Sequence, residues 1–388
     1  MSAPAPLRVL VVAPLRFPIR QPHAGGLESA VWNEVRGLRD RGHDVTVIAV
    51  AGSDVLGPGP DEFVLPTLDW PAGAPTSDSR YPSGSLARSV AALDRALDVV
   101  ARAPYRYDVI SNHCLHGLPL LRSAELGVPM VSTLHTPAEP ELVAAARAAA
   151  GTSRFLAVSE HTRAAWARAG VRSTVLGNGI APRDWPAGPG GHGLVWFGRL
   201  VPEKAPHLAI EVARAVGRPL TLAGRVGDQA YAERHVLPHL GDDVRYVGLL
   251  RRADLADLIG RSACALATPV WEEPFGLVGP EALMCGTPVA SFAAGGVREI
   301  ARVATGMRTA PVGDVGALAA ATRRLLDRTA AEPDLRGRVR AAARRHFSLD
   351  ARLDALERVF DGLVGDRYAT ATGLTGLTGL TGLTGLTA

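Results

Sequence analysis

Short, almost wholly apolar segments alternate with helical patterns along the first half of the chain. Residues 7–13 form the first apolar segment, residues 27–41 carry a helical pattern that ends at Gly42, and residues 44–49 form a second apolar segment. Strands buried on both faces of a parallel sheet have this composition, and strand, helix and strand in this order make a βαβ unit. The same alternation predicts further strands at residues 107–110, 129–134, 155–159 and 173–176.

A second series follows a cluster of proline and glycine at residues 182–193, which marks a linker. Two successive series predict an α/β protein in which two doubly wound, Rossmann-like domains face each other across a cleft. Ligands of such folds bind outside the carboxyl ends of the strands, so we expect the chemistry in the cleft. The strands of the second series are predicted at residues 194–197, 220–223, 244–247, 264–267 and 288–292, before a helical region from residue 317 to about residue 363.

Two segments fall outside this alternation. Residues 56–85 are rich in Gly, Pro, Ser and Asp, and we interpret them as an irregular connection near an acceptor site. Residues 373–387 are five consecutive Gly-Leu-Thr triplets, which are too short and too rich in glycine to pack.

The composition excludes several classes of protein. No apolar run approaches the roughly 20 residues that span a bilayer, and the N-terminus lacks the pattern of a signal peptide. Three widely spaced cysteines indicate neither a disulfide framework nor a metal cluster. The net charge is +4, but the arginines are scattered, which favours a solvated surface over a patch for nucleic acid. We therefore expect a cytoplasmic protein without a membrane segment or a nucleic-acid partner.

The chain contains one lysine, Lys204, and every other long cationic side chain is arginine. Lys204 follows Arg199 in a loop between a predicted strand and a helix. Two cations in this arrangement can clamp a diphosphate and stabilise its charge as it leaves. The alternative is a surface cluster of Arg199, Glu203 and Lys204. A single compact ammonium in an arginine-rich chain favours the diphosphate, because the two cations are not interchangeable around a phosphate.

The most informative motif runs from Glu273 to Glu281 and is followed by Gly-Thr-Pro. Phe275, Gly276 and Leu277 lie at a predicted strand-to-helix turn, where free backbone N–H groups suit an anionic or hydroxyl-rich ligand. Glu273 lies in the turn and Glu281 on the helix, so both can face one ligand and accept hydrogen bonds from vicinal hydroxyls. The alternative is that Glu273 caps the helix and Glu281 faces solvent. The apolar residues on both sides of Glu281 argue against this alternative.

Three further positions lie at the expected cleft. Gly25 and Gly26 follow the first strand and open the first helix, where glycine permits close backbone approach, although such a turn is common. His135 and His113 each come just after a predicted strand. We treat Glu28 and His113 as candidate acceptor-binding residues, and a purely structural role for His113 stays open.

Together these motifs resemble the retaining glycosyltransferases of family 4, which have the GT-B fold, over residues 7–363. Within the family the chain looks like an actinobacterial-type small-molecule glycosyltransferase, and Glu273 to Glu281 is similar to the family's paired-glutamate motif. The resemblance implies that Glu281 binds the donor ribose. It also implies that Glu273 holds the sugar hydroxyls together with the amides of Phe275, Gly276 and Leu277.

The resemblance assigns roles to the other motifs as well. It implies that Arg199 and Lys204 clamp the diphosphate and that the loop of Gly25 and Gly26 closes on the phosphates. It also implies that His135 contacts the transferred sugar near the reacting carbon. The catalytic residues are therefore expected to be His135, Glu273, Arg199 and Lys204.

The same resemblance divides the chain by role. We expect an N-terminal acceptor-binding domain at residues 1–183 and a C-terminal nucleotide-sugar-binding domain at residues 184–345. Residues 346–367 are expected to form a helix that crosses back onto the first domain, and residues 368–388 a disordered tail.

The expected reaction is the metal-independent transfer of a hexose from a nucleotide diphosphate sugar, with UDP preferred, to a hydroxyl of a small acceptor such as a specialised metabolite. The anomeric configuration is retained, and the leaving phosphate takes the proton of the acceptor. No cofactor and no metal are expected. One alternative is a GT-B enzyme that transfers nothing, such as an epimerase, or a phosphorylase. The other is a non-catalytic nucleotide-sugar-binding protein.

Overall fold

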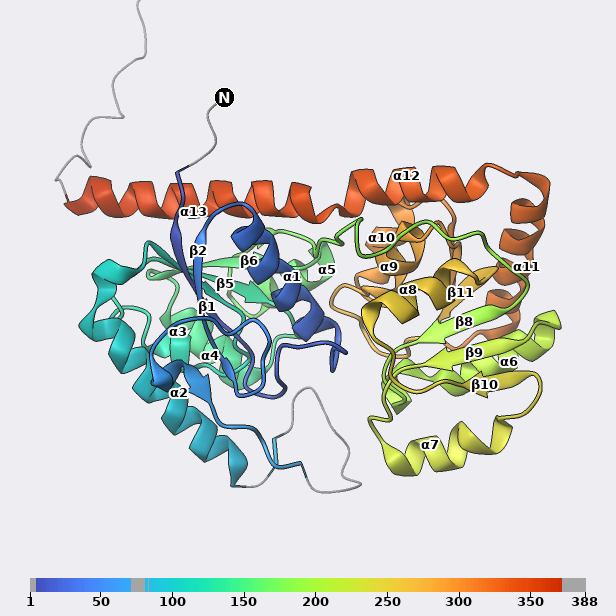
Figure 1. Cartoon of the computed structure of the whole chain (residues 1–388), viewed down its shortest axis with the longest axis horizontal. Helices are drawn as coiled ribbons and strands as arrows, with labels where there is room; N and C mark the ends of the chain where they lie inside the picture. The colour runs from blue at the N-terminus through green and yellow to red at the C-terminus, as the bar shows by residue number, and fades with distance from the viewer. Residues whose placement is uncertain (1–4, 71–80, 83, 372–388) are drawn as a thin grey trace, which may run out of the picture.

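The chain forms two domains that lie side by side (Figure 1). The first holds a parallel sheet of seven strands, in the order β3-β2-β1-β4-β5-β6-β7. The computed structural model describes residues 5–70, 81–82 and 84–371. The strands are β1 Arg8–Val12, β2 Asp44–Val50, β3 Val64–Leu65, β4 Val109–Asn112, β5 Met130–Leu134, β6 Ser153–Ala157 and β7 Thr174–Val175. The helices are α1 Gly26–Asp40, α2 Ser85–Arg102, α3 Leu118–Leu121, α4 Pro140–Ala148 and α5 Glu160–Arg168, with short 3-10 turns η1 Asp61–Phe63 and η2 Pro104–Arg106.

The second domain holds a parallel sheet of six strands, in the order β10-β9-β8-β11-β12-β13. The strands are β8 Leu194–Phe197, β9 Leu220–Ala223, β10 Val244–Tyr246, β11 Cys264–Ala267, β12 Val289–Phe292 and β13 Met307–Ala310. The helices are α6 Pro206–Val216, α7 Gln229–His235, α8 Arg252–Gly260, α9 Val278–Met284, α10 Val297–Val303, α11 Val315–Ala331 and α12 Leu335–Phe347, with η3 Pro202–Lys204 and η4 Leu237–His239.

Both faces of each sheet are covered, which explains why the central strands are continuous apolar runs. In β1, Val9 and Val11 pack in one hydrophobic core, whereas Leu10 and Val12 pack in another on the opposite face. All four side chains are fully buried. A parallel strand between two layers of helices has no solvent-facing side that would need polar residues.

The predicted α/β architecture is confirmed, and the predicted strands 194–197, 220–223 and 264–267 coincide with β8, β9 and β11. Two strands were missed. β3 has only two residues, and β13 is an edge strand in which Arg308 and Thr309 are exposed, so neither gives an apolar run. In each sheet the strand order reverses next to the first strand of its domain, at β1/β4 and at β8/β11, which is where such folds bind ligands.

Helix α13 (Leu349–Ala371) returns to the N-terminal domain and lies along its edge in Figure 1. It begins after Ser348, three residues later than the predicted crossing helix at 346–367. It also continues through residues 368–371, which were predicted as the start of the tail. The remainder of that predicted tail lies outside the described residues. Leu353, Leu356 and Phe360 of α13 are buried against α1 and the first sheet.

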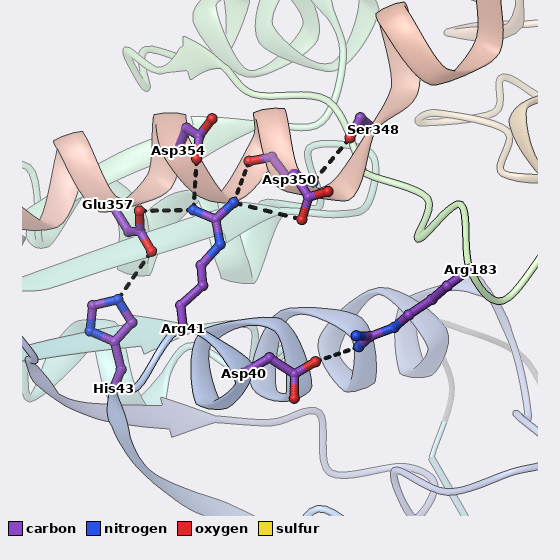
Figure 2. A network of polar contacts seen from close by, with 8 residues as sticks. All are labelled: Asp40, Arg41, His43, Arg183, Ser348, Asp350, Asp354 and Glu357. Atoms are coloured by element: carbon purple, nitrogen blue, oxygen red, sulfur yellow. Dashed lines mark hydrogen bonds and ion pairs between the residues drawn. The ribbon is translucent and has the colours of Figure 1, made fainter. Parts of the chain in front are cut away.

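Polar contacts join α13 to the end of α1 (Figure 2). Arg41 Nη1 lies 2.7 Å from Asp354 Oδ1 and 2.9 Å from Glu357 Oε2, and its Nη2 donates to the carbonyl oxygen of Asp350 at 2.9 Å. His43 Nε2 lies 3.1 Å from the other oxygen of Glu357. Asp354 is 57% exposed, and an ion pair at such a surface contributes little stability. The buried apolar side chains and the buried contact of His43 with Glu357 therefore hold the helix.

The seating of α13 generates a prediction at Gly179, in the linker between the domains. A Cβ there would lie 2.6 Å from the Cα of Leu349, a backbone atom that cannot rotate away. We expect Gly179→Ala to lower the free energy of unfolding by about 1–3 kcal/mol, as overpacking does, measured by thermal and urea denaturation.

Gly365→Ala is the control, because a Cβ at this exposed position of α13 meets nothing within 4 Å. It should be neutral or stabilise the protein by about 0.5–1 kcal/mol, since alanine favours the helix. Equal stability of the two variants would show that the linker does not press against α13.

Candidate functional site

A cavity of about 590 Å³ lies between the two domains. Segments that follow β1, β5, β8, β9 and β11 all line it, so the carboxyl ends of both sheets face the same space. The structure brings together in its wall every predicted site residue except one. These are Gly25, Gly26, Glu28, His135, Arg199, Lys204, Glu273, Phe275, Gly276, Leu277 and Glu281.

The turn between β11 and α9 has a backbone shape that requires glycine. Gly276 has a φ of +96°, and a Cβ there would lie 2.9 Å from Cγ2 of Val297. The start of α10 holds the turn, because the Gly296 amide donates to the carbonyl oxygen of Glu273 at 2.7 Å. Glu272 Oε2 accepts from the amide of Gly295, also at 2.7 Å. Glu273 is thereby fixed with its side chain at the cavity.

Glu281 projects from α9 into the same cavity. Burial raises the pKa of this carboxyl to about 8, because the nearby Arg252 only partly offsets the loss of water. The sequence predicted a carboxylate acceptor, whereas burial keeps Glu281 mostly protonated at pH 7. A protonated carboxyl both donates and accepts a hydrogen bond.

The cations of the predicted clamp lie on the loop after β8. Arg199 is 7% exposed, and its Nη2 lies 3.3 Å from Glu203 Oε1. Lys204 ends η3, forms an ion pair with Glu273, and lies 5.1 Å from the ring centre of Trp271. Lys204 and Glu273 therefore act as one coupled pair in the cavity, which sequence spacing did not indicate.

Thr268 holds the loop that carries Lys204, and sequence reasoning did not identify this role. Its Oγ1 lies 2.9 Å from the carbonyl oxygens of both Lys204 and Ala205, which share its one proton, and it accepts from Trp196 Nε1 at 3.0 Å. Ala205 has a φ of +44°, so the chain turns sharply here. Thr268 directly follows β11 and is buried. A hydroxyl residue just after an apolar strand was the only feature in the sequence that could have indicated this role.

The two predicted histidines occupy different places. His135 lines the cavity, and burial, together with the charge of Arg352, lowers its pKa well below the usual range. His113 is 1% exposed and lies behind His135, with 2.9 Å between His113 Nδ1 and His135 Nε2. The interpretation of His113 as an acceptor-binding residue is therefore corrected, because its side chain does not reach the cavity.

Arg252 of α8 was missed altogether, although it lines the cavity and joins the two domains. Its guanidinium donates to Asn33 Oδ1 at 2.9 Å and to Ser29 Oγ at 3.1 Å, both on α1. It also lies 2.8 Å from His23 Nε2 and pairs with Asp184 at 2.6 Å. The partners come from the other domain and the linker, so no local pattern around Arg252 could indicate them.

The described part of the chain contains neither a cluster of metal ligands nor a membrane-spanning helix. No three His, Cys, Asp or Glu side chains there group closely enough to hold a metal ion. No helix there is both long and apolar enough to cross a bilayer.

Comparison with protein families matches both halves of the chain. Residues 24–184 match the family described as Glycosyltransferase Family 4, and residues 189–346 match the family described as Glycosyl transferases group 1. The boundary between the two matches falls in the linker that separates the two sheets.

Individual proteins are similar over different lengths. A D-inositol 3-phosphate glycosyltransferase of Kribbella flavida is 31% identical over 345 residues, which are 75% of this chain and 80% of that protein. A glycogen synthase of Mycobacterium tuberculosis strain H37Rv is 37% identical over 186 residues, 44% of this chain and 43% of that enzyme, so the match spans less than half of its length. Among solved structures, Anabaena HepE in complex with UDP and glucose has a TM-score of 0.69 at 20% identity, over 92% of this chain and 99% of that chain. That likeness shows the fold.

The raised pKa of Glu281 generates a prediction about stability and pH. A carboxyl whose folded-state pKa lies above its unfolded value stabilises the protein at low pH, and the contribution is lost as pH rises from about 4.5 to about 8. The wild type loses this contribution as the pH rises, whereas Glu281→Gln, which cannot ionise there, does not. The melting temperature of the variant minus that of the wild type should therefore increase between pH 5 and about pH 9. We expect a change of several degrees.

Glu211→Gln, an exposed position on α6, is the control and should follow the wild type at every pH. A difference between Glu281→Gln and the wild type that does not vary with pH would contradict the protonated carboxyl.

Proposed function

This chain belongs to glycosyltransferase family 4, and from this premise we propose that it transfers a hexose from a nucleotide diphosphate sugar to a hydroxyl of a small acceptor. We propose further that UDP is the preferred nucleotide, that the anomeric configuration is retained, and that no metal or cofactor takes part. One observation carries the proposal. Arg199, Lys204, Glu273 and Glu281 line a single cavity at the strand ends of both domains.

The donor fits the cavity by charge and hydrogen bonding. Arg199 and Lys204 supply positive charge for a diphosphate, and Glu281 supplies a polar group for the vicinal hydroxyls of a ribose. Glu273 lies beside Lys204, so the sugar next to the diphosphate would meet Glu273 first. UDP is supported by HepE, a protein of similar fold that was crystallised with UDP and glucose.

Charge stabilisation of the leaving group is the main catalytic step in this proposal. As the bond between the sugar and the diphosphate breaks, negative charge develops on the diphosphate, and fixed cations stabilise it most where water is excluded. The acceptor hydroxyl attacks from the same face, and the departing phosphate takes its proton. His135 has a strongly lowered pKa and is neutral, so it serves as a hydrogen-bonding group and not as an acid.

The acceptor side of the cavity belongs to the N-terminal domain. Arg16, 5% exposed, lies over the ring of Tyr81 at 4.7 Å from its centre, and Glu28 and Glu139 also line the cavity. These polar groups favour a small hydroxylated acceptor. All three cysteines are free and buried, which fits a cytoplasmic location.

The proposed function predicts sugar transfer in the presence of a chelator. We expect the protein to consume UDP-glucose or a related nucleotide sugar with a mixture of small polyols, and to do so equally in excess EDTA, because Arg199 and Lys204 neutralise the diphosphate. Proton NMR of the product gives the anomeric configuration, which should match that of the donor.

Three outcomes would contradict parts of this proposal. Loss of turnover in EDTA that Mg²⁺ restores would remove metal independence, and an inverted product would remove retention. Tight binding of nucleotide sugars with neither transfer nor slow hydrolysis would identify a binding protein. An altered sugar released from the nucleotide without transfer would identify an epimerase, and a sugar 1-phosphate formed only with added inorganic phosphate would identify a phosphorylase.

Substitutions of Glu273 and Glu281 should have different effects on nucleotide binding and on turnover. Glu281→Ala should weaken the bare nucleoside diphosphate by about ten- to a hundredfold, the scale for a lost charge-assisted contact to the ribose. Glu273→Ala should leave that affinity equal or tighter, because it frees Lys204 for the diphosphate, and should mainly lower kcat. Calorimetry at about pH 9, where the free Glu281 is ionised, measures both variants.

Glu272→Ala provides the comparison, because Glu272 supports the same turn from outside the cavity. If Glu273→Ala loses the nucleotide as severely as Glu281→Ala, the division of roles is wrong. If Glu272→Ala matches Glu273→Ala in turnover, the effect belongs to the turn and not to a contact with the sugar.

A further inference from the structure

A line of buried polar side chains connects the crossing helix to His135, and we name it the Arg352–His135 chain. Arg352 Nη2 donates to Glu34 Oε2 at 3.0 Å, and Glu34 Oε1 lies 2.8 Å from His113 Nε2. His113 Nδ1 lies 2.9 Å from His135 Nε2. The side chains of Arg352, Glu34 and His113 are 5%, 1% and 1% exposed, so only His135 reaches the cavity.

The Arg352–His135 chain is electrically balanced when it contains one cation, Arg352, and one anion, Glu34. Burial alone would raise the pKa of Glu34, but His113, Arg352 and Ser111 together hold it well below its usual range. Glu34 is therefore ionised and pairs with Arg352, whose other nitrogen donates to the carbonyl oxygens of Leu176 and Gly177. A second buried cation at His113 would have no anion of its own, and an uncompensated buried charge is costly.

The balance of charge fixes the proton on each ring. An ionised carboxylate only accepts hydrogen bonds, so His113 carries its proton on Nε2, facing Glu34. In a neutral His113 the Nδ1 atom then has a lone pair and must accept from His135 Nε2–H. His135 is thereby left with an unprotonated Nδ1. This nitrogen takes no part in the contact with His113, and the side chain that carries it lines the cavity.

We propose that Glu34 and His113 are positioning residues that hold His135 as a neutral imidazole with a hydrogen-bond acceptor, Nδ1, facing the cavity. The group that it accepts from is a hydroxyl of the bound substrate, and this last identification rests on the proposed transferase function. Sugars and polyols present hydroxyl donors in every orientation, so an acceptor of fixed direction selects one of them. Arg352 belongs to α13, so the Arg352–His135 chain begins on the crossing helix. The direction of Nδ1 therefore depends on how α13 packs against the N-terminal domain.

The structure contains a matched cluster that ends elsewhere. His43, Glu357 and Arg41 are also a histidine, a glutamate and an arginine between α13 and the N-terminal domain, with 3.1 Å from His43 Nε2 to Glu357 Oε1 (Figure 2). Its second ring nitrogen, His43 Nδ1, accepts from the amide of Leu7 and does not face the cavity. Substitutions there control for the loss of a buried His–Glu contact under α13.

The tautomer can be read directly in the wild-type protein. Histidine labelled with ¹⁵N distinguishes a protonated from an unprotonated ring nitrogen in long-range proton–nitrogen spectra, and comparison with His135→Gln assigns the signals of His135. We expect protonated Nε2 and unprotonated Nδ1 for both His135 and His113 near pH 7.5. A proton on Nδ1 of His135, or a doubly protonated ring, would overturn the proposal.

Glu34→Gln should reverse the two hydrogen bonds that His113 makes, with residue 34 and with His135, while Arg352 still donates to residue 34. The amide oxygen of Gln accepts from Arg352, so its NH₂ group faces His113 Nε2, which must then be unprotonated. The proton of each ring moves to Nδ1, and His135 offers the cavity a donor in place of an acceptor. We expect kcat to fall at least about tenfold while the dissociation constant of UDP stays within about twofold, since the contact is to the transferred or attacking group.

Glu357→Gln is the matched control and should leave both kcat and the His135 signals unchanged, even if its melting temperature drops as far as that of Glu34→Gln. Unchanged His135 signals in a folded Glu34→Gln, or equal turnover of the two variants, would refute the positioning role. If Glu34→Gln does not fold, the wild-type spectrum still decides the tautomer. The spectra need no turnover, so an inactive wild type would remove the proposed function and leave the tautomer assignment to stand or fall by itself.

Discussion

The two domains are held by a double crossing of the chain, and the site depends on it. The chain leaves the N-terminal domain through the linker after β7 and returns between α12 and α13. The two crossings are bonded to each other, because the amide of Ile180 donates to Phe347 and the amide of Leu349 donates back to Ile180, at 2.7 and 3.0 Å. A hinge of two bonded segments keeps the strand ends of both sheets facing one cavity. Arg352 then stands at the hinge, in contact with the linker carbonyls and with α1.

Whether a buried carboxyl group of this protein is ionised depends on whether cations and hydrogen-bond donors lie close to it. Glu34 and Glu281 are the same residue type, and burial acts in the same direction on both. Arg352, His113 and Ser111 surround Glu34 and lower its pKa, whereas Glu281 has only the Arg252 charge and its pKa rises to about 8. Glu34 is thus a permanent anion that organises its neighbours. Glu281 is a group whose charge can change when a ligand brings hydrogen-bond donors to it.

The features that could be predicted from sequence are those made by neighbours in the chain. The central strands could be predicted from their apolar composition. The turn from Glu273 to Glu281 could be predicted from the spacing of its glycine and carboxylate residues, because the strand, the turn and the helix lie within a short stretch of the chain. The partner of Lys204 lies 69 residues away, that of Arg252 on α1 lies 219 away, and that of Arg352 lies 318 away. Such contacts arise only when distant parts of the chain fold together. The sequence therefore placed His113 in the cavity, whereas in the fold it is buried between Glu34 and His135. The edge strand β13 was missed for a simpler reason, since its exposed residues need not be apolar.

Helix α1 explains why so many of these distant contacts converge. A core-facing helix normally buries apolar side chains, yet α1 buries Glu28, Ser29, Asn33 and Glu34 along with Val31 and Val35. Each buried polar group needs a partner, and two of the partners are arginines from outside its domain, namely Arg252 for Ser29 and Asn33, and Arg352 for Glu34. Residues four apart lie on one face of a helix, so Ser29 and Asn33 meet α8 together, whereas Glu34 is turned about 100° away and meets His113. One rigid helix therefore sets the domain contact, the chain to His135 and, at its first residues, the glycine loop of the cavity. A shift of α1 that broke one of these contacts would therefore move the residues that make the other two.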